Sequence, residues 1–218
     1  RENTRVSKLI GINKAARTTC VKPAGTTSLV LGTSSGIHAW HNDYYIRRLR
    51  VGKNESIYTY LKQNHPELVK DEYFRPHDTA VIEIPQSAPK GSILRTESAF
   101  DLLKRVRKVA TEWVKPGHRV GSNTHNVSAT ISLKEKDWAK AGEWMWKNRD
   151  CYNGLSVLPY DGGTYTQAPF EDITKKEFDK LVKHLHEINL ENVNEETDNT
   201  DLSGELACAG GVCEITSL

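Results

Sequence analysis

The sequence has little sulfur and no long apolar run. It contains one Met and four Cys among 218 residues, and no stretch is apolar for the roughly 20 residues that a membrane helix needs. A secreted domain stabilised by disulfides would usually carry more Cys, spread along the chain. These absences favour a protein of the reducing cytoplasm, without a membrane as partner, in which any disulfide is transient and chemical.

Neither sign of charge is in excess. The 30 Lys and Arg residues nearly balance the 28 Asp and Glu residues, for a net charge of +2. This balance argues against a protein that binds nucleic acid electrostatically. The first residue is Arg1 rather than Met, and the hydrophobic content of 37% is low for a self-contained globule. We therefore expect a segment of a longer protein.

Hydrophobic periodicity predicts a mixed α/β body followed by a polar tail. Helices are predicted over 4–16, 56–64, 98–114, 135–147 and 174–188, and strands over 18–22, 44–51, 80–84, 127–133 and 155–160. Ser98 with Asp101 and Thr174 with Glu177 are expected to cap two of the helices. Residues 189–205 are too polar and acidic to bury a core, so 189–218 is predicted to be a flexible tail.

The residues after the strand predicted at 18–22 have the composition of an anion-binding loop. Pro23 ends the strand, and Gly25 lets the backbone approach a ligand. Thr26, Thr27 and Ser28 then supply hydroxyl groups where a helix can begin, and N–H groups at a helix start favour anions by about 0.3–1 kcal/mol each. The spacing is not that of a Walker A loop. An ordinary strand-to-helix connection is the alternative that these residues leave open.

Two of the four Cys, Cys208 and Cys213, lie close together near the end of the sequence. Two Gly between them allow the loop to fold back to disulfide geometry, and the spacing differs from that of a zinc knuckle. The polar segment between Leu190 and Cys208 has a root-mean-square span of about 20–25 Å and stretches to about 60 Å. We expect a redox-active pair that visits an internal site and an external reductant in turn. A disordered tail with incidental Cys is the alternative.

These two motifs, in this order, resemble those of a known family. Residues 19–28, Thr-Cys-Val-Lys-Pro-Ala-Gly-Thr-Thr-Ser, resemble the substrate-phosphate loop of adenosylcobalamin-dependent (class II) ribonucleoside-triphosphate reductases. The resemblance extends over nearly the whole chain. It includes Gly36-Ile37-His38 with Tyr44 to Arg48, Ser122 to Thr130, and Leu158 to Gly163 with Gln167-Ala168-Pro169.

The resemblance implies a fold and a reaction. The fold would be the C-terminal part of the reductase's ten-stranded α/β barrel over residues 1–188, with the phosphate loop at 22–28 and the flexible tail at 189–218. The reaction would be the reduction of ribonucleoside triphosphates to 2′-deoxyribonucleotides by a thiyl-radical mechanism, for DNA precursor synthesis. Adenosylcobalamin would be the cofactor, with only part of its binding surface in this chain.

The resemblance also assigns roles to residues. The substrate phosphates would bind to Ala24, Gly25, Thr26, Thr27 and Ser28. Cys208 and Cys213 would re-reduce the active-site disulfide and pass the oxidation to thioredoxin or a similar dithiol. The family's radical Cys lies in an Asn-x-Cys-x-Glu motif that this sequence lacks. We therefore expect the missing N-terminal part of the reductase to supply it, and the chain alone to be inactive.

Other candidate sites are weaker. Cys20 and Cys151 are expected to be packed structural residues. His38 with His41, and His184 with His186, lack a third ligand at suitable spacing, so no metal site is predicted. The basic run at 47–50 could contact phosphate, but a solvated strand face or salt bridges at the barrel edge are favoured. A nucleotide- or anion-binding module with a C-terminal redox-sensing or metal-binding Cys pair remains the alternative function.

Overall fold

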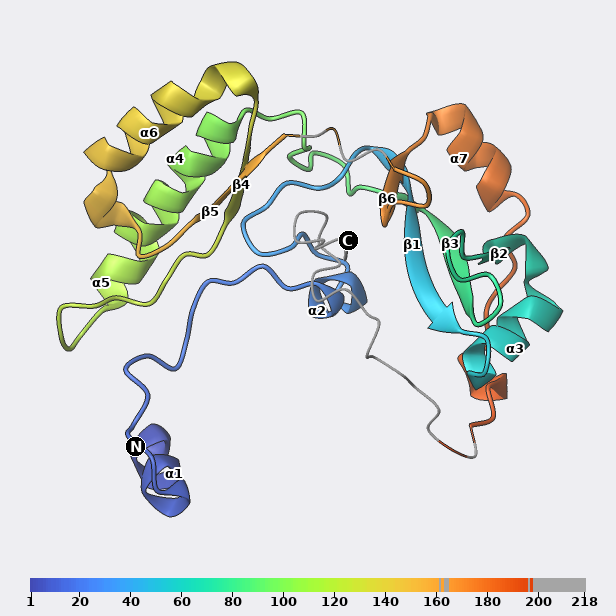
Figure 1. Ribbon diagram of the computed structural model, residues 1–218, viewed down its shortest axis with the longest axis horizontal. Helices are drawn as coiled ribbons and strands as arrows, with labels where there is room; N and C mark the ends of the chain where they lie inside the picture. Colours follow the sequence, from blue (N-terminus) through green and yellow to red (C-terminus); the bar gives the residue numbers. More distant parts are fainter. Residues whose placement is uncertain (161, 163–164, 196, 198–218) are drawn as a thin grey trace. The chain divides into compact units, whose positions relative to one another are not determined.

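The computed structural model describes residues 1–160, 162, 165–195 and 197. They divide into two compact units (Figure 1). Unit 1 consists of Arg1–His38 and Glu97–Tyr160, and unit 2 of Ala39–Thr96 and the described residues after 161. Each unit is therefore built from two separate stretches of the sequence.

Unit 1 contains a β–α–β unit. Strand β4 (Thr130–Leu133) pairs in parallel with β5 (Ser156–Pro159), and α6 (Trp138–Lys147) lies between them in the sequence. Parallel neighbours need a crossover connection, because a tight turn can join only antiparallel strands. The helix predicted at 135–147 is confirmed, with its first turn as a 3-10 turn at Glu135–Asp137.

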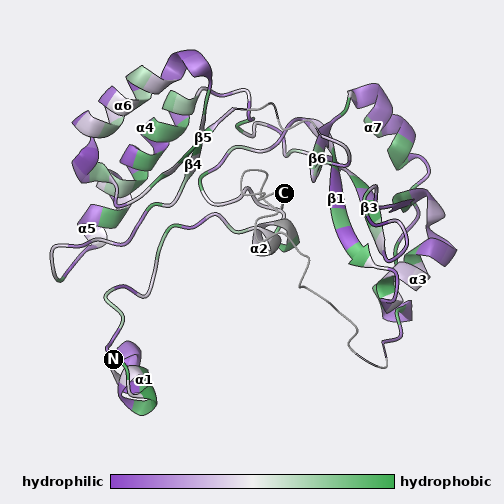
Figure 2. Ribbon diagram, viewed as in Figure 1, coloured by the Kyte–Doolittle hydropathy of each residue, from purple (hydrophilic) through white to green (hydrophobic). Residues whose placement is uncertain are grey.

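The core of unit 1 lies between this strand pair and two helices. Helix α4 (Ala99–Val109) continues as a π-helical turn (Ala110–Val114) and ends in the short α5 (Lys115–Gly117). Figure 2 shows hydrophilic and hydrophobic residues alternating around α4, as expected of a helix with one face in a core. The buried side chains come from α4 and its continuation, from one face of residues 127–133, and from α6: Leu102, Leu103, Val106, Ala110, Val114, Val127, Ala129, Ile131, Leu133 and Ala141. The alternation predicted for 127–133 is thus confirmed as a buried face, although the strand itself begins at Thr130.

The predicted cap of α4 is present. The Ser98 hydroxyl accepts the Asp101 N–H at 3.2 Å, and the Asp101 carboxylate accepts the Ser98 N–H at 3.3 Å. We expect Ser98→Ala to lower the free energy of unfolding by about 1 kcal/mol, because it leaves an N–H of the first turn without a partner. Ser98→Gly should cost only a few tenths of that amount. Urea unfolding of the two variants measures the difference, and equal midpoints for Ser98→Ala and wild type would contradict it.

Unit 2 is built on an antiparallel sheet of order β2-β3-β1-β6. Its strands are β1 (Tyr44–Gly52), β2 (Val69–Asp71), β3 (Thr79–Ser87) and β6 (Phe170–Asp172). Helices α3 (Ser56–Asn64) and α7 (Lys175–Val182) pack against it (Figure 1). Its hydrophobic core cluster consists of Val51, Leu61, Leu68, Val69, Ala80 and Ile82. The predicted strand at 44–51, the helix at 56–64 and the capping box of Thr174 with Glu177 are all confirmed.

Several predicted boundaries are wrong. Helix α1 spans Glu2–Ile10, because Gly11 adopts a left-handed conformation with φ 73° and ends it. Helix α7 ends at Val182 rather than near 188. Strand β3 continues through Pro85 to Ser87. Pro85 is tolerated because β2 pairs only with residues 80–82, so at Pro85 the strand has a single neighbour and needs no second ladder of hydrogen bonds.

The predicted α/β class is confirmed, but a barrel is not seen. Within the part of the chain that the structure describes, the sheets are the four-stranded and two-stranded ones above, and neither closes on itself. The strand predicted at 18–22 is reduced to an isolated bridge between Val21 and Val127. The predicted tail at 189–218 lies largely outside the described residues, within which Leu190–Asn192 forms a 3-10 turn. None of the described helices is long and apolar enough to cross a membrane.

Candidate functional site

The predicted phosphate loop begins just after a backbone pairing between Val21 and residues 126–128. The Val21 N–H donates to the Asn126 carbonyl at 3.0 Å, and the Ser128 N–H donates to the Val21 carbonyl at 2.8 Å. Pro23 follows at once, and the chain leaves this pairing to form the loop. The entry to the loop is therefore held by the segment that leads into β4.

Within the loop, the two hydroxyl residues whose side chains are described differ in environment. Helix α2 (Thr26–Val30) begins directly after Gly25. The Ser28 side chain is buried, and its hydroxyl donates back to the carbonyls of Ala24 and Gly25, at 3.1 Å for the latter. Thr27, by contrast, is exposed. Because a serine has one O–H donor, Ser28 stabilises the loop in this conformation, and Thr27 is the residue open to a ligand.

The exit from the loop packs back on its entry. The Ser35 hydroxyl donates to the Ala24 carbonyl at 3.0 Å. Gly36 has φ +58°, and a Cβ at this position would lie 2.9 Å from the Lys22 carbonyl oxygen. Only glycine combines this conformation with so close an approach to the backbone. Ser35 and Gly36 thus support the loop from its second side, and their role is not evident from residue type alone.

His38 connects this exit to strand β4. Its Nδ1 lies 2.9 Å from the Ser35 carbonyl oxygen, and its Nε2 accepts the Thr130 N–H at 3.1 Å. The ring is therefore neutral, with its proton on Nδ1. Burial lowers the pKa of His38, and the positive charge of Arg105 lowers it further. Arg105 itself donates to the Ile37 carbonyl at 2.9 Å and pairs with the Glu97 carboxylate at 3.0 Å.

In unit 2, the basic run at 47–50 holds β6 and the residues before it. Arg48 is buried, and it donates to the Glu83 carboxylate at 2.7 Å, to the Ala168 carbonyl at 3.1 Å and to the Glu171 carboxylate. The Arg47 guanidinium lies over the Phe170 ring at 4.3 Å. Of the two interpretations of this run, the structure favours internal ion pairs over a phosphate contact.

His41 also contacts β6. Its Nε2 lies 2.8 Å from the Asp172 carboxylate, its Nδ1 lies 2.6 Å from the Arg95 guanidinium, and its ring stacks on Phe170 at 4.9 Å. A neutral ring with its proton on Nε2 satisfies both partners, whereas a proton on Nδ1 would face another donor. Burial, with Arg95 as the next cause, lowers the pKa of His41 to about 4.

This shift predicts a pH dependence of stability. Because the pKa is about 4 in the folded protein and about 6.5 when the ring is free, the contribution of His41 is complete above pH 6.5 and is lost as the pH falls to 4. Each pH unit corresponds to about 1.4 kcal/mol, so the loss is on the order of 2 kcal/mol after allowance for solvent screening. Urea unfolding at pH 7 and pH 4 should show a smaller change in His41→Gln, whose side chain does not titrate. Equal changes in the two proteins would contradict this assignment.

Gln167 has a backbone conformation that the sequence did not predict. It has a positive φ of 55°, its amide donates to the Asp71 carbonyl at 2.8 Å, and its side-chain oxygen accepts the Tyr73 N–H at 2.8 Å. It therefore links the segment before β6 to the connection between β2 and β3.

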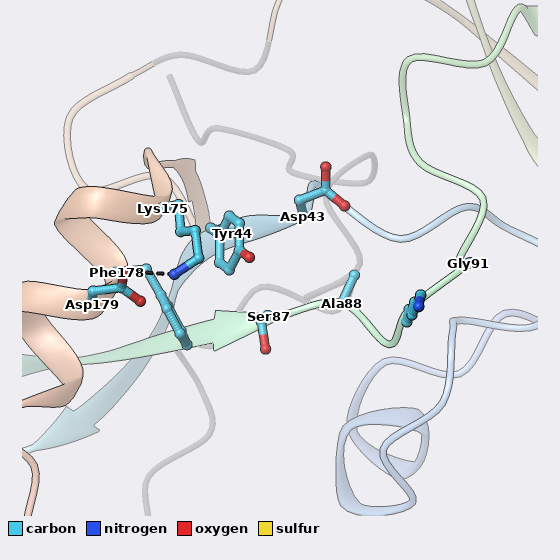
Figure 3. Close-up of a pocket in the computed structure, with 9 residues that line it drawn as sticks. Asp43, Tyr44, Ser87, Ala88, Gly91, Lys175, Phe178 and Asp179 are labelled. Carbon is cyan, nitrogen blue, oxygen red and sulfur yellow. Dashed lines mark hydrogen bonds and ion pairs between the residues drawn. The ribbon is translucent and has the colours of Figure 1, made fainter.

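A polar hollow of about 420 Å³ lies between the start of β1, the end of β3 and α7 (Figure 3). Its lining includes Tyr44, Ser87 and Lys90, and Lys175, which pairs with Asp179 at 2.6 Å. None of the described residues that line the hollow belongs to the predicted phosphate loop.

Two of the four Cys are among the described residues. Cys20 is exposed, so the expectation that it is packed is wrong, and Cys151 is half-buried. Cys208 and Cys213 lie outside the described residues. Across the described ranges, no group of three His, Cys, Asp or Glu is placed to hold a metal ion.

Comparisons of the sequence with known proteins found curated relatives but no family model. No protein-family model matches the chain. Curated relatives named adenosylcobalamin-dependent ribonucleoside-triphosphate reductase do match, each over 96% of this chain and 28% of its own length. They come from Lactobacillus gasseri (28% identical over 217 residues), Lactobacillus leichmannii (27% over 218) and Euglena gracilis (26% over 221).

A solved structure gives the same result at the level of the fold. A crystal structure of a B12-dependent (class II) ribonucleotide reductase matches with a TM-score of 0.66 and 26% identity, over 88% of this chain and 26% of that one. The chain thus spans little more than a quarter of the proteins it matches. The predicted resemblance is confirmed: in sequence and in fold, the chain is similar to part of the adenosylcobalamin-dependent class II ribonucleotide reductases.

Proposed function

We propose that this chain is part of a ribonucleotide reductase that converts ribonucleoside triphosphates to 2′-deoxyribonucleotides in the cytoplasm. The loop from Ala24 to Ser28 binds the substrate phosphates, and Cys208 with Cys213 forms the dithiol shuttle. One observation carries the proposal: a loop with this composition is held on both flanks by one strand segment, in a chain aligned over 96% of its length with reductases of this name.

The loop can bind phosphate with its own groups. The N–H groups in the first turn of a helix lack partners within that helix, so the start of α2 offers donors to an anion. Thr27 adds an exposed hydroxyl, and the exposed Lys22 adds a positive charge just before the loop. Ser28 and Ser35 fix the Ala24 carbonyl and thereby the shape of the loop.

The strand pair of unit 1 supports a place in the reductase barrel. A parallel pair with a helix between its strands is the unit from which parallel α/β barrels are built. One face of residues 127–133 is buried against α4 and α6, while Ser128, Thr130 and Ser132 alternate with the buried residues and are half-buried. This polar face is the one that would line the interior of a barrel completed by further strands.

Adenosylcobalamin is the cofactor named for the relatives, and we propose it for the complete enzyme. The hollow in unit 2 is about 420 Å³, near the lower end of the range for drug-sized ligands, and a corrin is much larger. No step assigned to this chain therefore passes through the cofactor.

The proposed shuttle balances the electrons of the reaction. Replacing the ribose 2′-hydroxyl by hydrogen and releasing water requires two electrons and two protons, which two active-site thiols supply as they form a disulfide. The Cys208 and Cys213 thiols then reduce that disulfide by thiol–disulfide exchange and become oxidised themselves. Thioredoxin or a similar external dithiol restores them. The Cys that carries the thiyl radical belongs to the part of the enzyme outside this sequence.

The loop assignment is tested with Thr27→Val, which removes the hydroxyl and keeps the shape of the side chain. In the full-length protein we expect the affinity for a ribonucleoside triphosphate to fall about tenfold, as for one lost hydrogen bond to a charged group. Affinity for the unphosphorylated nucleoside should not change. Thr33→Val is the matched control, because it makes the same change at an exposed residue just beyond α2. Unchanged triphosphate affinity in Thr27→Val would argue against phosphate binding here.

A further inference from the structure

The candidate phosphate loop has a support that reaches across unit 1. Its entry pairs with residues 126–128 through Val21, and its exit connects to Thr130 through His38. Both flanks are thus attached to one continuous stretch of backbone, just where β4 begins. The exit attachment depends on a side chain, because the His38 ring is the group that spans from the Ser35 carbonyl to the Thr130 N–H.

We propose that His38 is a positioning residue for the phosphate loop, acting as a neutral imidazole that ties the loop exit to β4. The proposal rests on the function proposed above for Ala24 to Ser28. The ring acts through Ser35: its Nδ1 proton bonds to the Ser35 carbonyl, which also accepts the His38 backbone N–H at 3.0 Å, and the Ser35 hydroxyl bonds to the Ala24 carbonyl at 3.0 Å. His38 itself makes no contact with the first turn of α2 in these bonds, so its effect on the ligand is indirect.

The bond to Thr130 requires the neutral ring. A backbone N–H can donate only to an unprotonated Nε2, so protonation of His38 replaces an acceptor with a donor and removes the attachment. The charged groups that face the ring are Arg105, Glu97 and Lys22. Arg105 and Lys22 oppose protonation and Glu97 favours it, while burial opposes it most strongly. The attachment is accordingly present at neutral pH and is lost on acidification below the ordinary range of histidine.

Two substitutions separate the halves of the bridge. His38→Gln can place its amide oxygen near the Nε2 position and keep the Thr130 bond, whereas His38→Asn can place its amide nitrogen near Nδ1 and keep only the Ser35 bond. Neither side chain titrates. His118→Gln is the control, because His118 is half-buried in a turn away from the loop, where its Nε2 lies 2.7 Å from the Gly121 carbonyl oxygen.

Hydrogen–deuterium exchange of the full-length protein without ligand tests the attachment itself. We expect amides at 24–38 to exchange about threefold to tenfold faster in His38→Asn than in wild type, as for the loss of one net hydrogen bond. His38→Gln should lie between them, and α4 should keep its protection in every variant. Unchanged exchange at 24–38 in His38→Asn would overturn the proposal. Faster exchange throughout the protein in both His38→Asn and His38→Gln would also overturn it.

Binding of a ribonucleoside triphosphate between pH 8 and pH 4 tests the consequence, because this interval extends below the ordinary titration range of histidine. The phosphates titrate equally in all samples, so the ratio of wild-type affinity to His38→Gln affinity reports the histidine. We expect this ratio to fall about threefold as the pH falls, and to stay constant when His118→Gln replaces His38→Gln in the comparison. A pH-independent ratio for His38→Gln would overturn the proposal.

The two proposals fail in different ways. If Thr27→Val leaves triphosphate affinity unchanged while His38→Asn still frees the loop, the phosphate assignment fails and the attachment stands. If Thr27→Val weakens binding while His38→Asn leaves exchange unchanged, the phosphate assignment stands and His38 is not its support.

Discussion

With Ser in place of both Cys208 and Cys213, the proposed shuttle predicts that the full-length protein completes about one turnover and then stops when thioredoxin is the reductant. Without the terminal thiols, the disulfide formed in the first round has no route to an external protein dithiol. Triphosphate binding and single-turnover reduction should be retained. The measurement is deoxynucleotide formed per enzyme, with thioredoxin and with a small dithiol that can enter the active site directly.

A matched variant and a truncation make this expectation specific. Cys151→Ser removes a half-buried thiol of unit 1 that has no part in the shuttle, so repeated turnover should continue. Truncation before Asp201 should reproduce the double replacement. If truncation instead changes nucleotide affinity and leaves turnover intact, the Cys pair is a sensor rather than a shuttle, and the shuttle assignment is wrong.

Arg48→Met should produce the largest loss of stability among the polar residues of unit 2. The guanidinium is buried and contacts two carboxylates and one carbonyl, so its removal leaves Glu83 and the Ala168 carbonyl without their donor. Removing one partner of a buried pair typically costs about 3–5 kcal/mol, and the exposure of Glu171 places our expectation near 3 kcal/mol. Urea unfolding measures the loss, and exchange at residues 167–172 should accelerate, because Arg48 holds this segment on β1.

Two comparisons isolate the cause. Lys175→Met removes an exposed ion pair with Asp179 and should cost far less, because such pairs contribute little to stability. Arg48→Lys keeps the charge but cannot reach all three partners, so it should recover only part of the loss. A cost for Arg48→Met no larger than that for Lys175→Met would show that the pairs contribute nothing beyond solvent-exposed contacts.

Local chemistry was predictable wherever one residue type decides the outcome. The caps at Ser98 and Thr174 follow from a hydroxyl three residues before a carboxylate, and the buried face of residues 127–133 follows from strict alternation. The phosphate-loop candidate could be located because Pro, Gly and hydroxyl residues occur together. Boundaries were less predictable: Pro85 lies inside β3 because a neighbouring strand is too short to reach it, which the residues of β3 alone do not indicate.

The sequence by itself determined the α/β class, the main helices and strands, the candidate loop and the relationship to class II reductases. Only the tertiary structure decided that Ser28 stabilises the loop from within, that His38 bridges its exit to Thr130, and that Arg47 and Arg48 hold β6. For His38 and the two Arg residues, the physical reason is sequence separation. His38 and Thr130, like Arg48 and Ala168, meet only after the chain has returned to the same unit, and such contacts depend on the packing of segments that local propensity does not encode.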